Sequence, residues 1–166
     1  MSGSMLDGNK LGLVRQTLQH VLELLGDTDR VSLVTFNDVA RREVPLFRVT
    51  PENRATVMRR FNNSQARGGT NIGGALARAL SIFEQRRVVN PVSTCLLFTD
   101  GCDSTGTADM WHSLYEPLRR AGATVHTFGL GADHDARCCS HISSATSGAW
   151  KRRIGGGEEE KRSQKE

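Results

Sequence analysis

Three hydroxyl side chains and one carboxylate in this sequence are placed where they could bind a divalent metal ion. Ser2 and Ser4 lie one residue apart, just ahead of a helical pattern. Thr70 precedes a second helical pattern, and Asp100 follows the apolar run "CLLF" closely. All four offer hard oxygen ligands, which suit Mg²⁺, Ca²⁺ or Mn²⁺ better than zinc. With mostly neutral ligands the ion would remain under-neutralised and would attract a carboxylate from outside.

The elements that must position these residues alternate between helices and strands. Apolar spacing predicts helices at residues 10–26, 50–61, 71–87, 108–122 and 133–148. It predicts strands at residues 29–36, 40–49, 92–101 and 124–131. This order implies an α/β layered fold with a mostly parallel sheet. Ligands of such sheets bind beyond the carboxyl ends of the strands, where the "TDG" cluster is expected.

Each candidate ligand also has a plain structural interpretation. The Ser-Gly-Ser segment could be a flexible start of the chain. Thr70 could cap the helix that follows it, and Asp100 could belong to an Asp-Gly turn. Asp103 is interpreted as a turn residue and Asn71 as a support for the loop. Convergence of the four oxygen donors at one edge of the sheet favours a metal site.

A second candidate cluster lies in "HDARCCSH". On a helix His134, Cys138 and His141 would share one face, which could provide three zinc ligands. The segment offers no clear fourth ligand. We therefore interpret it as a helix with a half-buried cysteine and surface histidines.

Composition argues against several function classes. The net charge is +4 and aromatic residues make up 5% of the chain, without interleaving with the basic residues, so no nucleic-acid partner is expected. No run of about 18 apolar residues and no charged-then-apolar leader occurs, so we expect a cytoplasmic protein without a membrane partner.

Catalytic motifs are also missing from the sequence. No G-x-S-x-G elbow occurs, and the glycine-rich "GGTNIGGAL" lacks the Lys-Ser/Thr of a phosphate loop. We therefore expect no enzyme activity. A metal-dependent hydrolase stays open as a less favoured alternative, because hard-cation sites also occur in hydrolases.

Taken in order, "SGSM", "GGTNIGGAL" and "LLFTDG" resemble the motifs of a von Willebrand factor type A domain, over roughly residues 1–148. The metal-ion-dependent adhesion site of that family reads D-x-S-x-S, then a Thr in a loop, then an Asp after a core strand. The resemblance implies that Ser2, Ser4, Thr70 and Asp100 bind Mg²⁺, with Ca²⁺ or Mn²⁺ as alternatives.

The same resemblance implies a Rossmann-like layered fold and a function as a protein-interaction module. A partner's Asp or Glu would complete the metal shell. The alternative is a metal-independent interaction or a structural role with a degenerate site. The chain is most similar to intracellular eukaryotic members, some of which carry RING zinc modules in ubiquitin ligases. No RING pattern of Cys and His occurs here, so ligase activity is not implied.

Two departures from the family pattern lead to structural expectations. The first aspartate of D-x-S-x-S would precede Met1 by one residue, and the apolar strand that carries it, in the middle of the sheet, has no counterpart. We therefore expect an incomplete domain with a break between two strands. The domain is expected to occupy residues 1–148 and to be followed by a disordered charged tail at residues 149–166, short of the family's last strand and helix.

Overall fold

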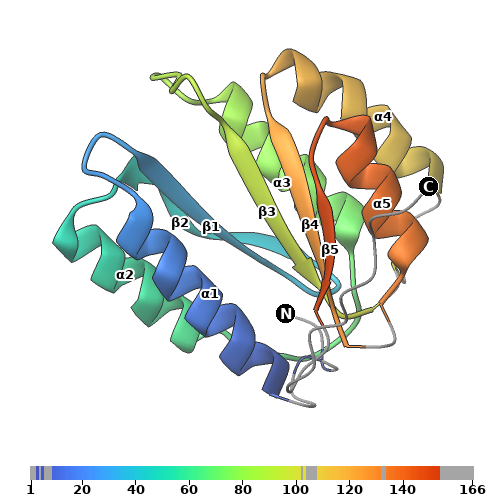
Figure 1. Ribbon diagram of the computed structural model, residues 1–166, viewed down its shortest axis with the longest axis horizontal. Coiled ribbons are helices and arrows are strands. Elements are labelled where there is room, and N and C mark those ends of the chain that lie inside the picture. The colour runs from blue at the N-terminus through green and yellow to red at the C-terminus, as the bar shows by residue number, and fades with distance from the viewer. Residues whose placement is uncertain are drawn as a thin grey trace, which may run out of the picture.

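Figure 1 shows a computed structural model of the chain, in which helices lie on both sides of the strands. The structure describes residues 3, 5, 9–101, 103, 108–131 and 134–153. The elements in chain order are α1 (Lys10–Leu24), β1 (Arg30–Phe36), β2 (Ala40–Arg48), α2 (Pro51–Asn62), α3 (Ile72–Glu84), β3 (Thr94–Thr99), α4 (Ala108–Arg120), β4 (Thr124–Leu130), α5 (Ala136–Ala145) and β5 (Trp150–Arg153). The predicted α/β fold with alternating helices and strands is confirmed.

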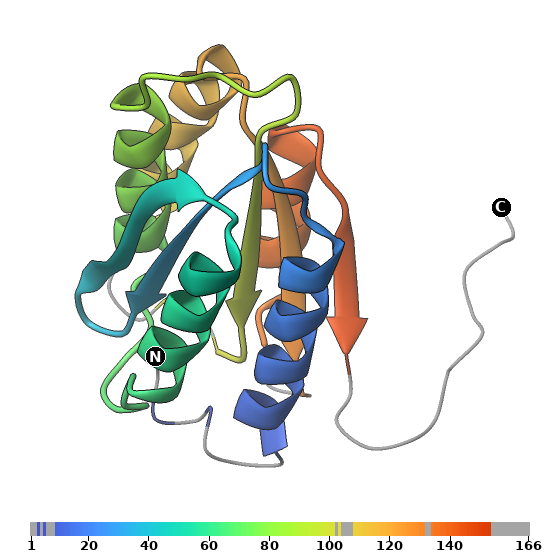
Figure 2. The ribbon, with the colours of Figure 1, turned by 90° about the vertical axis from the view of Figure 1, so that its left-hand side faces the viewer.

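The strands form two separate sheets within the described residues. β1 and β2 pair antiparallel, while β3, β4 and β5 form a parallel sheet in that order. The break falls between β1 and β3, as expected from the sequence. Figure 1 and Figure 2 show α1 and α2 on one side of the strands and α3, α4 and α5 on the other.

Apolar side chains join the two sheets across this break. Below α1, Val14 belongs to a cluster that includes Leu33 of β1, Phe98 of β3 and Leu130 of β4. A second cluster, built around α3, α4, α5 and the parallel strands, also includes Phe36 of β1. Each fully buried aliphatic or aromatic side chain stabilises the fold by about 1.5–3 kcal/mol. The helices therefore hold together strands that do not pair with each other.

Capping residues fix the starts of helices α2 and α3. Thr50 accepts a hydrogen bond from the Asn53 N–H at 3.2 Å, and Pro51 occupies the first helical position, as predicted. Asn71 caps α3 by accepting from the Gly74 N–H at 2.6 Å. Thr70, the residue that the sequence suggested as a cap, thus lies one position ahead of the cap of α3.

The C-terminal boundary expected from the sequence is wrong for residues 149–153. Strand β5 pairs in parallel with β4, and the Thr127 N–H donates to the Ala149 carbonyl at 3.0 Å. Backbone pairing needs no apolar side chains, so the charged segment "WKRR" gave no strand signal. The remaining part of the expected tail, residues 154–166, lies outside the described residues. In the described part of the chain, no helix combines the length and the apolar character that crossing a bilayer requires.

Candidate functional site

The Asp100 carboxylate lies buried directly after the last residue of β3. Only 2% of the residue is exposed. Lys10, the first residue of α1, donates from Nζ to Asp100 Oδ2 at 3.0 Å. Burying a carboxylate without a compensating charge is costly, so this ammonium group stabilises the buried position of Asp100.

The Thr70 hydroxyl lies beside the residue that follows Asp100. Thr70 is 7% exposed and lies in the loop that leads into α3, one residue before the cap of this helix. A Cβ atom placed on Gly101 would be 3.2 Å from Thr70 Oγ1, so glycine allows this close approach. The structure thus brings two of the four predicted ligands, Thr70 and Asp100, to the same edge of the sheet.

The loop that carries Thr70 is held by the turn between β1 and β2. The Asn71 N–H donates to the Asn37 carbonyl at 2.8 Å, and Asn71 Nδ2 donates to the Asp38 carbonyl at 3.1 Å. Asp38 Oδ1 accepts from the Gly69 N–H at 2.9 Å. The predicted supporting role of Asn71 is confirmed, whereas Asp38 was not foreseen. An Asp in a strand-connecting turn is common, so its sequence position gave no signal.

Asp103 links the first turn of α3 to α4. Its Oδ2 atom accepts from the Gly73 N–H at 3.2 Å and from Trp111 Nε1 at 2.7 Å. The sequence interpretation as a simple turn residue therefore missed a bridging role. Through these bonds Asp103 fixes the start of α3 relative to the loop after β3, and with it the geometry around Thr70 and Asp100.

Ser2 and Ser4 lie outside the described residues, so their role as ligands remains a prediction. Gly3, between them, is described, and its N–H donates to the Gly68 carbonyl at 3.2 Å. Met5 is 5% exposed and belongs to the apolar cluster beneath α1. Gly3 therefore lies beside the loop that carries Thr70.

Lys10, like Asp38, is a residue of the site that sequence reasoning missed. A lysine in the first turn of a helix is unfavourable, because its positive charge lies at the positive end of the helix dipole. Its presence there could have indicated that an acidic residue elsewhere in the chain pairs with it. A Cβ atom on Gly131 would be 3.4 Å from Lys10 Nζ, which places the ammonium group near the end of β4 as well. Lys10 thus reaches the carboxyl ends of two parallel strands.

The oxygen atoms of Thr70 and Asp100 are suitable ligands for a hard divalent cation, but the negative charge of Asp100 is already neutralised. A hydroxyl and a carboxylate at the edge of a sheet are the oxygen ligands that Mg²⁺ prefers. The Lys10 ammonium, however, already neutralises the Asp100 carboxylate at 3.0 Å. A divalent ion that used Asp100 Oδ2 would have to displace Lys10 from this atom.

The zinc candidates are not gathered into one site. The imidazole of His134 contacts the Gly131 carbonyl through Nδ1 at 2.8 Å, whereas His141 Nδ1 lies 3.3 Å from the Tyr115 hydroxyl. Cys138 is buried in the core cluster of α3, α4 and α5. Among the described residues, no three side chains of His, Cys, Asp or Glu are placed to hold a metal ion together.

The family model described as von Willebrand factor type A domain matches residues 1–153. The chain therefore belongs to the von Willebrand factor type A domain family, whose members commonly serve as protein-interaction modules. A solved structure of a von Willebrand factor type A protein from Catenulispora acidiphila superposes with a TM-score of 0.84 at 24% identity, covering 92% of this chain and 36% of that chain. This similarity supports the fold.

The chain is also similar to parts of two proteins with different names, a plant ubiquitin ligase and a mussel byssus protein. The E3 ubiquitin-protein ligase WAV3 of Arabidopsis thaliana is 33% identical over 100 residues, which are 60% of this chain and 14% of the ligase. Proximal thread matrix protein 1 of the mussel byssus, with a zinc-occupied MIDAS motif, superposes with a TM-score of 0.69 at 20% identity, covering 87% of this chain and 36% of that chain. The chain spans less than a quarter of the length of this ligase and of two other curated relatives.

Proposed function

We propose that this domain binds a protein partner through a divalent cation that bridges to an Asp or Glu of that partner. Thr70 and Asp100 would hold the ion, with Ser2 and Ser4 as further ligands and Mg²⁺ as the expected ion, in preference to Ca²⁺ or Mn²⁺. The observation that supports this proposal best is the position of the Thr70 hydroxyl beside Gly101, next to the buried Asp100 carboxylate. The zinc-occupied MIDAS motif of the mussel protein is consistent with an ion in a domain of this fold.

A bound cation would supply the positive charge that a partner's carboxylate needs at this edge. The protein's own residues set the conditions for that binding. Asn71, Asp38 and Asp103 keep the loops in place through the hydrogen bonds described above. Lys10 would have to withdraw from Asp100 Oδ2, and its partial exposure of 13% gives the ammonium group access to water.

A second candidate function is a metal-independent protein interaction at the same edge. The Lys10–Asp100 ion pair favours this candidate, because the ammonium group already provides the charge that a cation would bring. In that case the pair is a permanent structural contact, and a partner would contact the surrounding loops directly. The two candidates differ in whether removal of divalent ions weakens partner binding.

Affinity capture with the wild-type domain, in buffers containing MgCl₂ or EDTA, tests the cation-dependent function. Thr70→Val removes the hydroxyl at nearly constant volume, and Thr70→Ser keeps it as the matched control. We expect partners to be retained with Mg²⁺ by the wild type and by Thr70→Ser, and to be lost with EDTA or with Thr70→Val. Capture that is equal in MgCl₂ and EDTA would support the metal-independent function instead.

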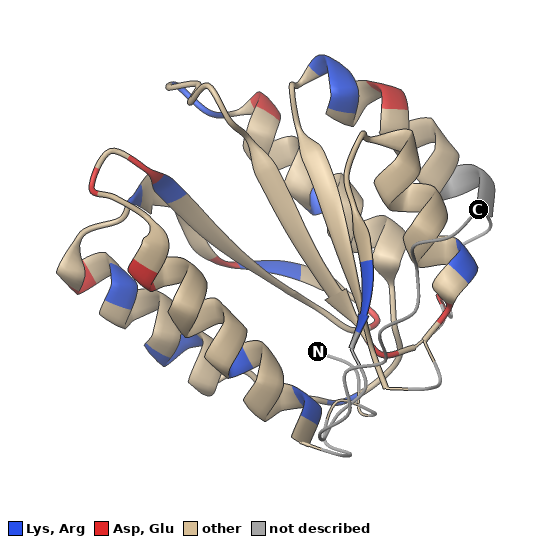
Figure 3. Cartoon of the chain, viewed as in Figure 1, with Lys and Arg blue, Asp and Glu red and all other residues tan. Residues whose placement is uncertain are grey.

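The proposal includes a cytoplasmic location and no catalytic, nucleic-acid or membrane role. Figure 3 shows Lys and Arg residues on α1, α2, β2, α4 and β5, spread over several elements of the fold. Spread charge of this kind is typical of a solvated surface. Ligase activity belongs to the Arabidopsis relative, of which this chain covers 14%, and is not proposed for this domain.

A further inference from the structure

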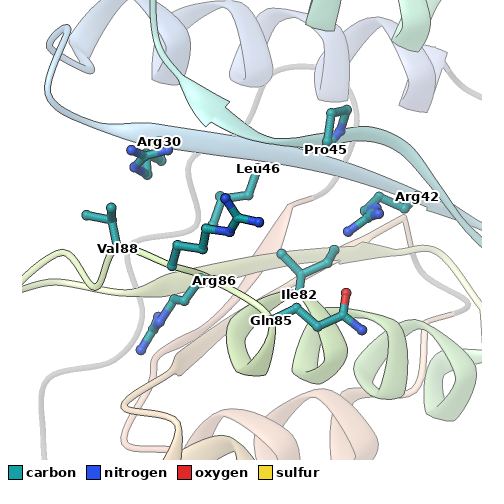
Figure 4. Close-up of a pocket in the computed structure, with 9 residues that line it drawn as sticks. Arg30, Arg42, Pro45, Leu46, Ile82, Gln85, Arg86 and Val88 are labelled. Atoms are coloured by element: carbon teal, nitrogen blue, oxygen red, sulfur yellow. The ribbon is translucent and has the colours of Figure 1, made fainter.

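A pocket of about 390 Å³ lies between the β1–β2 sheet and the C-terminal end of α3, remote from the Thr70–Asp100 site. Its lining includes Arg30, Arg42 and Arg87 together with the apolar side chains of Leu46, Ile82 and Val88. Figure 4 shows Arg30 and Arg42 toward opposite ends of this pocket, with Leu46 and Ile82 between them. The volume falls in the range of small-molecule sites.

Three of the four arginines that line the pocket have no bonding partner among the described residues. Arg86 is the exception, because its guanidinium donates to Ser93 Oγ at 2.8 Å and to the Ala121 carbonyl at 2.6 Å. Arg30, Arg42 and Arg87 form no side-chain hydrogen bond or ion pair within the described part of the chain. Arg86 therefore supports the wall, while the other three leave positive charge unbalanced in the pocket.

The acidic residues next to Arg30 and Arg42 in the sequence are held elsewhere. Asp29 Oδ2 accepts from the Gly26 N–H at 2.8 Å. Glu43 Oε1 accepts from the Thr35 hydroxyl at 2.8 Å. Thr35 shares a strand face with Leu33, which packs toward α1 and α2, so this carboxylate lies on the face of the sheet away from α3. The lining of the pocket contains no Asp or Glu.

Irregular pairing of β2 shapes the wall of the pocket. Val31 pairs with Phe47 and Leu33 with Val44, so β2 contains an extra residue in this interval. Pro45 and Leu46 lie in that bulge and both line the pocket. A bulge changes the direction in which the neighbouring side chains point, and Pro45 lacks the N–H that regular pairing would need. The backbone conformation of β2 therefore determines the shape of this wall of the pocket.

We propose that this pocket binds a small molecule that carries two or more phosphate groups. Arginine binds phosphate oxygens in a bidentate manner, and three unbalanced guanidinium groups exceed what one monoanion would neutralise. Arg30 and Arg42 lie four residue steps apart along the β1–β2 ladder, which is about 13 Å at the rise of a strand, so their guanidinium groups can contact phosphate groups at different positions along the pocket. Leu46, Ile82 and Val88 offer apolar contact to the body of the ligand.

The proposed site is independent of the Thr70–Asp100 site. Thr70 precedes the N-terminal end of α3, whereas Ile82 and Gln85 of the pocket lie at its C-terminal end. The 13 residues of α3 place the two ends about 20 Å apart at the rise of an α-helix. Ligand binding in the pocket therefore needs no divalent cation.

Calorimetric titration of the whole chain with tripolyphosphate, in EDTA, tests this proposal. Arg42→Ala removes a pocket arginine, and Arg41→Ala removes the exposed neighbouring arginine, which does not line the pocket and serves as the matched control. Arg42 and Arg87 are exposed, so their replacement should not prevent folding, and thermal unfolding of each variant checks this.

We expect the wild type and Arg41→Ala to bind tripolyphosphate with similar affinity and Arg42→Ala to bind at least about tenfold more weakly. The double variant R42A/R87A should show no binding. Equal losses in Arg41→Ala and Arg42→Ala, or no binding by the wild type, would overturn the proposal. Tighter binding of a poly-glutamate peptide than of tripolyphosphate would assign the pocket to an acidic protein segment and also overturn it.

Discussion

Lys10 and Asp100 are separated by 90 residues in the sequence, and their side chains meet at 3.0 Å at the carboxyl end of β3. The contact ties the start of α1 to the carboxyl ends of the parallel strands β3 and β4. The two partners are buried unequally, since 13% of the lysine side chain but only 1% of the aspartate side chain is exposed. The loss of each partner should therefore have a different cost.

Replacement of Lys10 should destabilise the domain more than replacement of Asp100. Lys10→Met leaves a buried carboxylate without its cation, which should lower the free energy of unfolding by about 3–5 kcal/mol. Asp100→Asn leaves a lysine that can extend toward water, so a loss of about 1–2 kcal/mol is expected. Urea denaturation measures both changes, and the reverse order would contradict the assignment of unequal burial.

The exposed ion pair of Glu116 with Arg120 provides the control for this comparison. Glu116→Gln breaks a contact of 3.1 Å whose side chains are 56% and 76% exposed. Surface pairs of this kind contribute about 0–1 kcal/mol, so this variant should unfold close to the wild type.

Asn71→Ala should affect both the stability and the proposed metal site. The change removes the cap of α3 and the bond from Nδ2 to the Asp38 carbonyl, at an expected cost of about 1–2 kcal/mol. Thr50→Ala removes the cap of α2 and is the matched control for the lost cap alone. We expect a somewhat lower midpoint of thermal unfolding for Asn71→Ala, which also loses the bond to Asp38, and weaker Mg²⁺-dependent capture for Asn71→Ala only. Equal capture by the two variants would show that Asn71 has no role beyond capping.

Gly148→Ala should destabilise the docking of β5. A Cβ atom on Gly148 would overlap the backbone carbonyl of Val125, which cannot move without disturbing β4. We expect a loss of about 1–3 kcal/mol or more in urea denaturation. In Gly26→Ala the new Cβ would meet only Asp29 Oδ2, at 3.7 Å, so this control should stay within about 0.5 kcal/mol of the wild type. Unchanged stability of Gly148→Ala would mean that the segment leading into β5 does not pack against β4 in solution.

Alkaline pH should destabilise the domain partly through Cys95. Burial raises the pKa of the Cys95 thiol from 9.0 to about 11. Between these values the unfolded chain has lost the thiol proton and the folded chain keeps it, so the free energy of unfolding falls as pH rises. The expected slope is up to about 1.4 kcal/mol per pH unit. Stability that stays level through this range in the wild type would contradict the desolvation of this half-buried thiol by the core around it.

Cys95→Ala isolates this contribution. Burial, and secondly the charge of Cys138, raise the pKa of Tyr115 to about 12, so the tyrosine adds an alkaline loss in wild type and variant alike. The difference between the two proteins, measured by urea denaturation from neutral pH to pH near 11, therefore reports on Cys95. We expect the variant to lose less stability than the wild type over this range.

The sequence predicted those parts of the fold that depend on local patterns. Thr50 and Pro51 marked the start of α2, and apolar spacing located α1, α3 and the buried strands, because these signals come from neighbouring residues. Strand β5 was missed because its stability comes from pairing with β4, which four mostly charged residues do not reveal. The sequence also did not predict contacts between segments that lie far apart in the chain.

In the candidate site too, local motifs were predictable from the sequence and contacts between distant residues were not. Thr70 and Asp100 were predicted from motifs, and the structure brings them to one edge, whereas Ser2 and Ser4 remain predictions. The ion pair of Lys10 could not be read from the sequence because its partner lies 90 residues away. The arginine pocket likewise draws on three separate segments of the chain, none of which carries a recognisable motif.

Electron paramagnetic resonance of Mn²⁺, titrated into the wild type, Asp100→Ala and Lys10→Met, tests the proposed cation site most directly. The proposal predicts stoichiometric Mn²⁺ binding by the wild type and its loss in Asp100→Ala. Tighter binding is expected in Lys10→Met, because the ammonium group no longer competes for Asp100 Oδ2. Mn²⁺ that remains entirely free with the wild type, or that binds Asp100→Ala equally well, would contradict a cation site built on Thr70 and Asp100.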